Sequence, residues 1–118
     1  MQIVADLHTH TVASGHAFST VKEMAEAAAQ QGLHMLAITD HGLAMPGAPH
    51  KYYFENLTFC PRFMFGVEIL RGVEANIIDY DGNLDMPPEL LDRMDIVLAG
   101  FHDATGYKKG GIEENTKA

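Results

Sequence analysis

The chain has little cysteine and no long apolar run. Its single cysteine, Cys60, excludes an internal disulfide framework and is typical of a reducing compartment, so a cytoplasmic location is expected. No apolar run approaches the roughly 20 residues that a membrane-spanning helix needs. Residues 1–6 are neither basic nor long enough to form a signal peptide. We therefore expect no membrane partner.

Positive charge is also scarce. Eight Lys and Arg residues stand against 16 Asp and Glu residues, which gives a formal net charge of −8. Because no basic stripe is present to displace phosphate counterions, nucleic-acid binding is not expected. A small phosphorylated molecule remains compatible with this charge if divalent cations also bind, since each cation adds two positive charges at the site.

Hydrophobic residues are abundant, and their spacing predicts the fold class. They make up 47% of 118 residues, enough for one domain with its own core. Short apolar runs that end at polar loops predict strands at residues 3–7, 35–39, 67–74 and 95–102. Helix-forming segments predict helices at residues 20–31, 52–59, 87–94 and from 112 onward. Alternating strands and helices predict an α/β fold with a parallel sheet covered by helices.

Individual residues indicate where the first predicted helix begins and ends. Thr20 and Glu23 have the spacing of a capping box, and Gly32 is placed to end the first helix. Lys108 and Lys109 are expected in a solvated loop. Because a closed (β/α) barrel needs about 250 residues, this number of strand–helix units predicts about half of a barrel.

Histidines gather where the predicted strands end. His8 and His10 alternate at the first strand end, so both side chains point the same way, and two neutral imidazoles are half of a metal site. Carboxyl ends of parallel strands lie on one rim. We therefore expect a set of candidate ligands to converge there: His8, His10, His16, His41, Glu74 and His102. Mixed nitrogen and oxygen ligands suit zinc, manganese or iron, so the spacing does not identify the metal.

Several other residues have simpler interpretations. His34 lies between a helix end and a strand, where a structural role is expected, and His50 is expected to cap a helix or to be exposed. Glu68 is the weaker acidic candidate because it lies earlier on its strand than Glu74. Cys60 has no partner nearby in the sequence, so we do not expect it to be a nucleophile.

Three stretches resemble the PHP (polymerase and histidinol phosphatase) family, and most closely its YcdX-type stand-alone zinc phosphatases. They are ADLHTHTVAS at residues 5–14, AITDHG at residues 37–42 and LRGVEANI at residues 70–77. The likeness extends over all 118 residues. It implies the N-terminal half of a distorted (β/α)7, TIM-like barrel that holds three metal ions, usually zinc, at its C-terminal rim.

The resemblance also implies roles for single residues. His8, His10 and Glu74 would bind the first ion. Glu74 would bridge to a second ion that His102 also binds, and His16 and His41 would hold the third. Asp6 and Asp40 would orient neighbouring imidazoles, and Arg71 would help to hold phosphate.

The activity implied by the resemblance is hydrolysis of small phosphomonoesters by a metal-activated hydroxide at a trinuclear site. Two alternatives stay open. One is a non-catalytic PHP-type structural module, and the other is a metal-dependent amide or lactone hydrolase, because other metal barrels also begin with an H-x-H pair after their first strand. Amide and phosphomonoester substrates would separate the two enzyme activities.

The family's remaining metal ligands lie on later strands, beyond residue 118. We therefore expect residues 1–118 to be the N-terminal part of a single PHP domain. A C-terminal half or a second chain would complete the barrel, and a homo-oligomer is left open. The 118 residues alone are expected to be weakly active or inactive.

Overall fold

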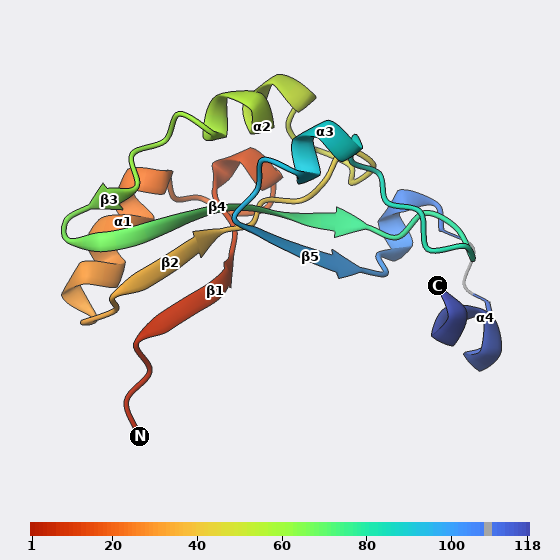
Figure 1. The fold of residues 1–118 in the computed structure, drawn as a ribbon, viewed down its shortest axis with the longest axis horizontal. Helices are drawn as coiled ribbons and strands as arrows, with labels where there is room; N and C mark the ends of the chain where they lie inside the picture. Colours follow the sequence, from red (N-terminus) through yellow and green to blue (C-terminus); the bar gives the residue numbers. More distant parts are fainter. Residues whose placement is uncertain (108–109) are drawn as a thin grey trace.

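A curved parallel sheet forms the centre of the computed structural model, which describes residues 1–107 and 110–118 (Figure 1). The parallel strands are β1 (Ala5–Thr9), β2 (Met35–Ile38), β4 (Val67–Asn76) and β5 (Ile96–Gly100). β1 pairs with β2, β2 with β4, and β4 with β5. The expected loop at Lys108 and Lys109 lies outside the described residues.

The long strand β4 connects two staggered parts of the sheet. Its first half pairs with β2, from Met35 opposite Glu68 to Ile38 opposite Arg71. Its second half pairs with β5, beginning with Gly72 opposite Ile96. The sheet therefore curls as a half-barrel, which confirms the predicted α/β class.

The helices are α1 (Val21–Gln30), α2 (Lys51–Leu57), α3 (Pro88–Leu91) and α4 (Ile112–Lys117), and two 3-10 turns, η1 and η2, span Val12–Ser14 and Asp103–Thr105. Helices α1, α2 and α3 pack against the sheet, whereas α4 lies apart from it, beyond the ends of β4 and β5 (Figure 1). The predicted capping box is present, because the Thr20 hydroxyl accepts the Glu23 N–H and the Glu23 carboxylate accepts the Thr20 N–H. No helix within residues 1–107 and 110–118 is long and apolar enough to span a membrane.

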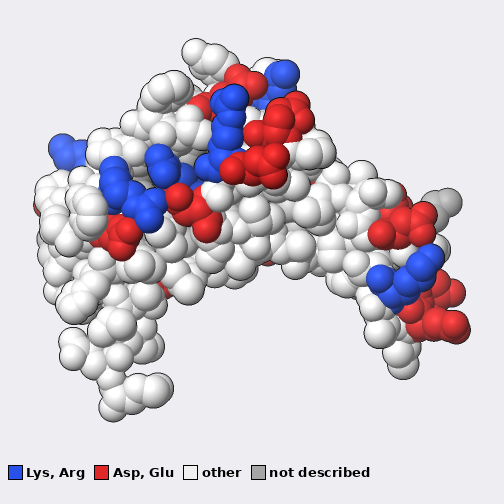
Figure 2. All heavy atoms as spheres, viewed as in Figure 1, with Lys and Arg blue, Asp and Glu red and all other residues white. Residues whose placement is uncertain are grey.

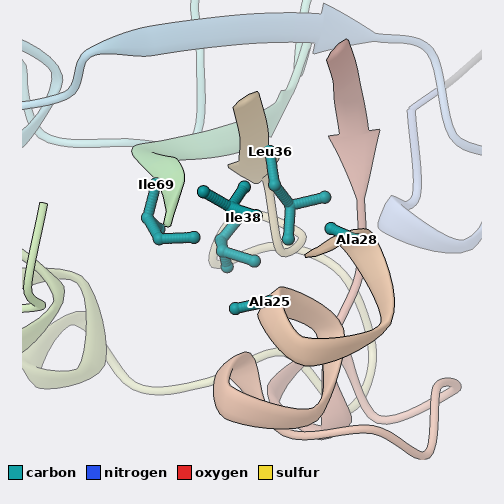
Figure 3. Close-up of a cluster of buried hydrophobic side chains, with 6 residues drawn as sticks. Ala25, Ala28, Leu36, Ile38 and Ile69 are labelled. Carbon is teal, nitrogen blue, oxygen red and sulfur yellow. The ribbon is translucent and has the colours of Figure 1, made fainter. Parts of the chain in front are cut away.

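Two apolar clusters attach the helices to the sheet. In the first, Ala25 and Ala28 of α1 pack against Leu36, Ile38 and Ile69 of the strands, all of them buried (Figure 3). The small alanine side chains let the helix approach the branched strand residues closely.

The second cluster lies under α2 and α3, which flank the same side of the sheet (Figure 1). Phe54 of α2 and Leu90 of α3 pack against Val73 and Ala75. The second half of β4, which carries Glu74, is therefore held firmly on its outer face.

β2 ends one residue earlier than predicted, at Ile38, and the limits of the other three parallel strands differ from the predicted ones by one or two residues. β1 runs from Ala5 to Thr9, two residues later than predicted, because β2 begins opposite Ala5 and the preceding Ile3 and Val4 are exposed. β4 continues to Asn76, so Glu74 lies inside the strand. β5 ends at Gly100, which places His102 just beyond it.

A short antiparallel strand, β3 (Phe63–Met64), was not predicted. It pairs with the start of β4 through a two-residue turn in which both Phe65 (φ 54°) and Gly66 (φ 78°) have positive φ. Such turns favour Asn or Gly at the first position, so the phenylalanine at this position gave no indication of a hairpin.

Some charged side chains form ion pairs on the outside of the molecule. In the view of Figure 2, mixed basic and acidic groups lie over the α2 side and near α4. These ion pairs include Arg62 with Glu68 at 2.8 Å and Lys117 with Asp81 at 3.1 Å.

Candidate metal centre

Six side chains meet where the parallel strands end. His8 lies on β1 and His10 directly after it, His16 follows η1, His41 follows β2, Glu74 lies on β4, and His102 follows β5. These residues lie close together because the carboxyl ends of parallel strands form one rim of the sheet. The structure thus brings together all six predicted candidate ligands.

Glu74 is at the middle of this group. Its carboxylate oxygens face four imidazoles: Oε2 lies 3.1 Å from His8 Nε2, 3.1 Å from His10 Nε2 and 3.3 Å from His41 Nδ1, and Oε1 lies 3.2 Å from His102 Nε2. One carboxylate with two separately directed oxygens can bridge two cations.

The six residues form three overlapping groups of possible metal ligands, and within each group the ligand atoms lie within 4.8 Å of one another. The groups are His8, His10 and Glu74; His41, Glu74 and His102; and His10, His16 and His41. They contain every pairing that the family resemblance implies. They also place His41 beside the second pair and His10 beside the third.

The arrangement of nitrogen atoms suits cations. His16 Nε2 lies 3.0 Å from His41 Nε2, and His8 Nε2 lies 3.3 Å from His10 Nε2. The Nδ1 atoms of His41 and His102 are buried and have no hydrogen-bond partner among residues 1–107 and 110–118. Buried polar atoms are normally paired, so imidazole nitrogens that face one another around a carboxylate fit a metal site.

Burial favours the neutral form of two of the imidazoles. It is the main cause that lowers the pKa of His10, and it lowers the pKa of His41 to about 4 against the opposing charge of Glu74. Burial also opposes the charge of Glu74, but a hydrogen bond from His8 and the adjacent imidazoles outweigh it and lower the pKa of this carboxyl. Neutral histidine and ionised carboxylate are the forms that bind metals.

The two predicted orienting carboxylates differ in what they contact. Asp6 Oδ1 accepts the backbone N–H of His8 at 3.2 Å. Asp40 is fully buried and accepts hydrogen bonds from Thr11, Ser14 and the Tyr53 hydroxyl. Its carboxylate reaches the centre through the Ser14 hydroxyl, which lies 3.0 Å from His10 Nδ1.

Arg71, the predicted phosphate contact, is engaged in the sheet. Its guanidinium lies 2.9 Å from Asp95 Oδ2 and donates to the Thr58 carbonyl at 2.9 Å. These contacts join β4 to the residue before β5 and to the end of α2.

The two remaining histidines, His34 and His50, have structural roles outside the group of candidate ligands. His50 Nδ1 accepts the Tyr52 N–H at 3.2 Å, so His50 caps α2 as one of its two expected roles. The backbone of His34 joins the chain before β1 to β4, through the carbonyl of Val4 and the N–H of Glu68.

Sequence reasoning missed a second set of polar residues that hold the site in place. Besides Thr11, Ser14 and Tyr53, it missed Asp85. This carboxylate accepts the N–H groups of Ala44 at 2.7 Å and Asn76 at 2.8 Å, and so holds the loop after His41 against β4. Ala44 and Asp85 are separated by 41 residues, and no spacing pattern in the sequence connects them.

Known proteins are similar to this chain in sequence. The PHP domain family matches residues 6–112. A protein named "Probable phosphatase" from Acetivibrio thermocellus is 59% identical over 118 residues, which are 100% of this chain and 48% of that protein. A probable phosphatase from Caldanaerobacter subterraneus subsp. tengcongensis is 52% identical over the same 118 residues, 46% of its length.

A probable phosphatase from Clostridium novyi is 49% identical, again over 100% of this chain and 48% of its own length. The chain thus spans about half the length of these relatives. Because the family match covers nearly all of the sheet and every candidate ligand, the chain belongs to the PHP domain family.

Proposed function

We propose that the full-length protein is a metal-dependent phosphoesterase that hydrolyses small phosphomonoesters. The observation that carries this proposal is the Glu74 carboxylate, which lies within 3.3 Å of imidazole nitrogens from three different strand ends. Membership of the PHP domain family and relatives named as probable phosphatases support it.

We propose that the described side chains hold three cations, and the three groups of possible ligands support this number. His8, His10 and Glu74 would hold one, Glu74 and His102 with His41 nearby a second, and His16 and His41 a third. Zinc is the metal we expect, with manganese and iron as alternatives for the same donors. Bound divalent cations would supply positive charge for the phosphoryl oxygens and would activate water.

Exposure indicates where a substrate would enter. The His8 side chain is 52% exposed, whereas those of His41 and Glu74 are 6% and 11% exposed. His16 is also exposed, so the described part of the centre is open to solvent at His8 and His16 and closed at His41. A small phosphate ester would meet the metal ligands from this open side.

A test of this proposal measures metal content and substrate class in the full-length protein. We expect hydrolysis of p-nitrophenyl phosphate that stops after chelation and returns with zinc, manganese or iron, and no hydrolysis of a p-nitroanilide amide. Cleavage that survives removal of all metal would contradict the proposal. Cleavage of the amide alone would favour the alternative hydrolase, and metal binding without any hydrolysis would favour the structural module.

Glu74→Gln gives a residue-specific form of the same test. The substitution keeps the shape of the side chain but removes the charge between the imidazoles, so metal affinity and turnover are expected to fall by more than the roughly 10–100-fold typical of outer partners. Glu68→Gln is the matched control, because Glu68 lies on the same strand and pairs with Arg62. Equal behaviour of the two variants would count against the proposed centre.

A further inference from the structure

Ser14 is a buried hydroxyl in contact with two of the candidate metal ligands. It ends η1, the turn that follows β1, and its side chain is almost fully enclosed. Its Oγ atom lies 2.7 Å from Asp40 Oδ1, 3.0 Å from His10 Nδ1 and 3.1 Å from the backbone nitrogen of His41. One hydroxyl thus joins the segments that follow β1 and β2.

The direction of these hydrogen bonds follows from what each group can donate. Asp40 Oδ1 already accepts the backbone N–H of Thr11 at 2.7 Å, so this oxygen acts as an acceptor. The single hydroxyl hydrogen of Ser14 therefore points to Asp40. Only its lone pairs remain for the other two contacts, and both the His10 ring and the His41 backbone must donate to them.

The partners of Asp40 leave it no freedom to reverse this arrangement. Its second oxygen, Oδ2, accepts the hydroxyl of Thr11 at 2.8 Å and is also contacted by the hydroxyl of Tyr53. Asp40 and Thr11 are completely enclosed in the fold. A buried carboxyl group with a full set of donors keeps a defined orientation.

We propose that Ser14 is a positioning residue that places the hydrogen of the His10 ring on Nδ1 and leaves the lone pair of Nε2 facing Glu74. In the structure, His10 Nε2 lies 3.1 Å from Glu74 Oε2 and 3.3 Å from His8 Nε2. The opposite tautomer would direct a hydrogen into the space between these three ligands. Ser14 thereby prepares His10 to bind a cation before the cation arrives.

This inference rests on the metal centre of the proposed function, but its first test needs neither metal nor substrate. Two-bond ¹H–¹⁵N spectra of the metal-free, full-length protein at pH 8 report which nitrogen of each histidine carries hydrogen, and His10→Gln identifies the signal of His10. We expect His10 to carry its hydrogen on Nδ1, the form that histidine in water disfavours. A wild-type His10 with its hydrogen on Nε2 would overturn the inference.

The second test uses Ser14→Ala. We expect the His10 signal to move toward the Nε2–H form and the affinity for one zinc ion to fall by about 10–100-fold, measured by competition with a chelating dye. Thr58→Ala is the control, because among the described residues its hydroxyl bonds only to the Glu55 carbonyl at the end of α2, so its loss should change neither value. An unchanged tautomer or zinc affinity in Ser14→Ala would overturn the inference.

The two tests also separate a positioning role from a purely structural one. A structural role alone would lower the melting temperature of Ser14→Ala without moving the His10 tautomer, and that result would contradict the inference. If Ser14→Ala does not fold, the wild-type spectrum still decides. A full-length protein that binds zinc as expected but hydrolyses no phosphomonoester would count against the proposed function and leave the role of Ser14 intact.

Discussion

His41 combines the deepest burial among the candidate ligands with contacts on both sides of its ring. Its side chain is 6% exposed, Nε2 faces His16, and Nδ1 faces Glu74. A protonated ring in this position would be poorly solvated, which is why burial lowers its pKa to about 4. The centre therefore holds a neutral ligand at pH values where an exposed histidine would be charged.

The low pKa of His41 predicts how the stability of the metal-free protein depends on pH. An unfolded chain protonates this histidine below its ordinary pKa of 6.5, whereas the folded chain keeps it neutral down to about 4. The unfolded state binds more protons between these values, so the free energy of unfolding should fall as pH decreases through this window. One such group contributes at most about 1.4 kcal/mol per pH unit.

Urea unfolding at a series of pH values from 4.5 to about 7.5 measures this dependence. His41→Asn should show a shallower slope, with a part remaining because the pKa of His10 is lowered in the same direction. Stability that rises as pH falls, or an equal slope in wild type and variant, would show that His41 is not held neutral by the fold.

At the scale of elements, β4 supports both halves of the sheet and carries Glu74. Gly72 lies at the point where its pairing changes from β2 to β5. A Cβ atom at Gly72 would lie 2.6 Å from Ile96 Cγ2 and 2.7 Å from the Ile96 backbone oxygen. The missing side chain therefore allows β5 to approach, and this approach brings His102 within reach of Glu74.

Gly72→Ala is expected to separate β4 from β5. Because the backbone of Ile96 cannot yield without loss of strand pairing, we expect a cost of about 1–3 kcal/mol in the free energy of unfolding. We also expect weaker binding of the ion assigned to Glu74 and His102. Denaturant unfolding and zinc titration of the full-length protein measure the two effects.

Gly111→Ala serves as the control for this substitution. Gly111 has a negative φ, and the nearest atom to its added Cβ is a carboxylate oxygen of the flexible Glu114 side chain at 3.1 Å. Its stability and zinc binding should stay close to wild type. A Gly72→Ala protein as stable as Gly111→Ala would refute the close approach of β5.

At the scale of the whole molecule, the curled sheet has open edges. Within the part of the chain that the structure describes, β1 and β5 each pair with a strand on one side only. Apolar side chains are exposed on and beside these strands, with Leu7 at 44%, Val97 at 39% and Phe101 at 41%. Unpaired strands with apolar side chains are sites of association.

We therefore expect residues 1–118, produced by themselves, to associate and to bind a hydrophobic dye, unlike a protein as long as the relatives. Val97→Lys should reduce this association by placing a charge on β5. Val12→Lys, a substitution at an exposed residue of η1, should not. Sedimentation and dye fluorescence provide the measurements, and a monomeric 118-residue chain that binds no dye would contradict the expectation.

Much of this architecture follows from short-range patterns. The apolar runs predicted β2 almost to the residue, and Thr20 with Glu23 marked the start of α1, because strand periodicity and helix caps depend only on neighbours in the chain. The six candidate ligands could be named in advance since each follows or ends an apolar run, and parallel strands share a rim. The β3 hairpin was not predicted, because Phe65 has a positive φ that is unusual for phenylalanine.

The features that the sequence did not predict depend on contacts formed in the tertiary structure. No local pattern indicates that Ser14 lies between Asp40 and His10, that Asp85 holds the loop after His41, or that Asp95 engages Arg71. Ser14 and His10 are four residues apart, but the partners in the other three contacts are 24 to 41 residues apart. The sequence alone therefore predicted which residue types would be ligands. Their orientation and protonation depend on the tertiary structure, because the direction of a buried hydrogen bond is set by the groups that the fold encloses with it.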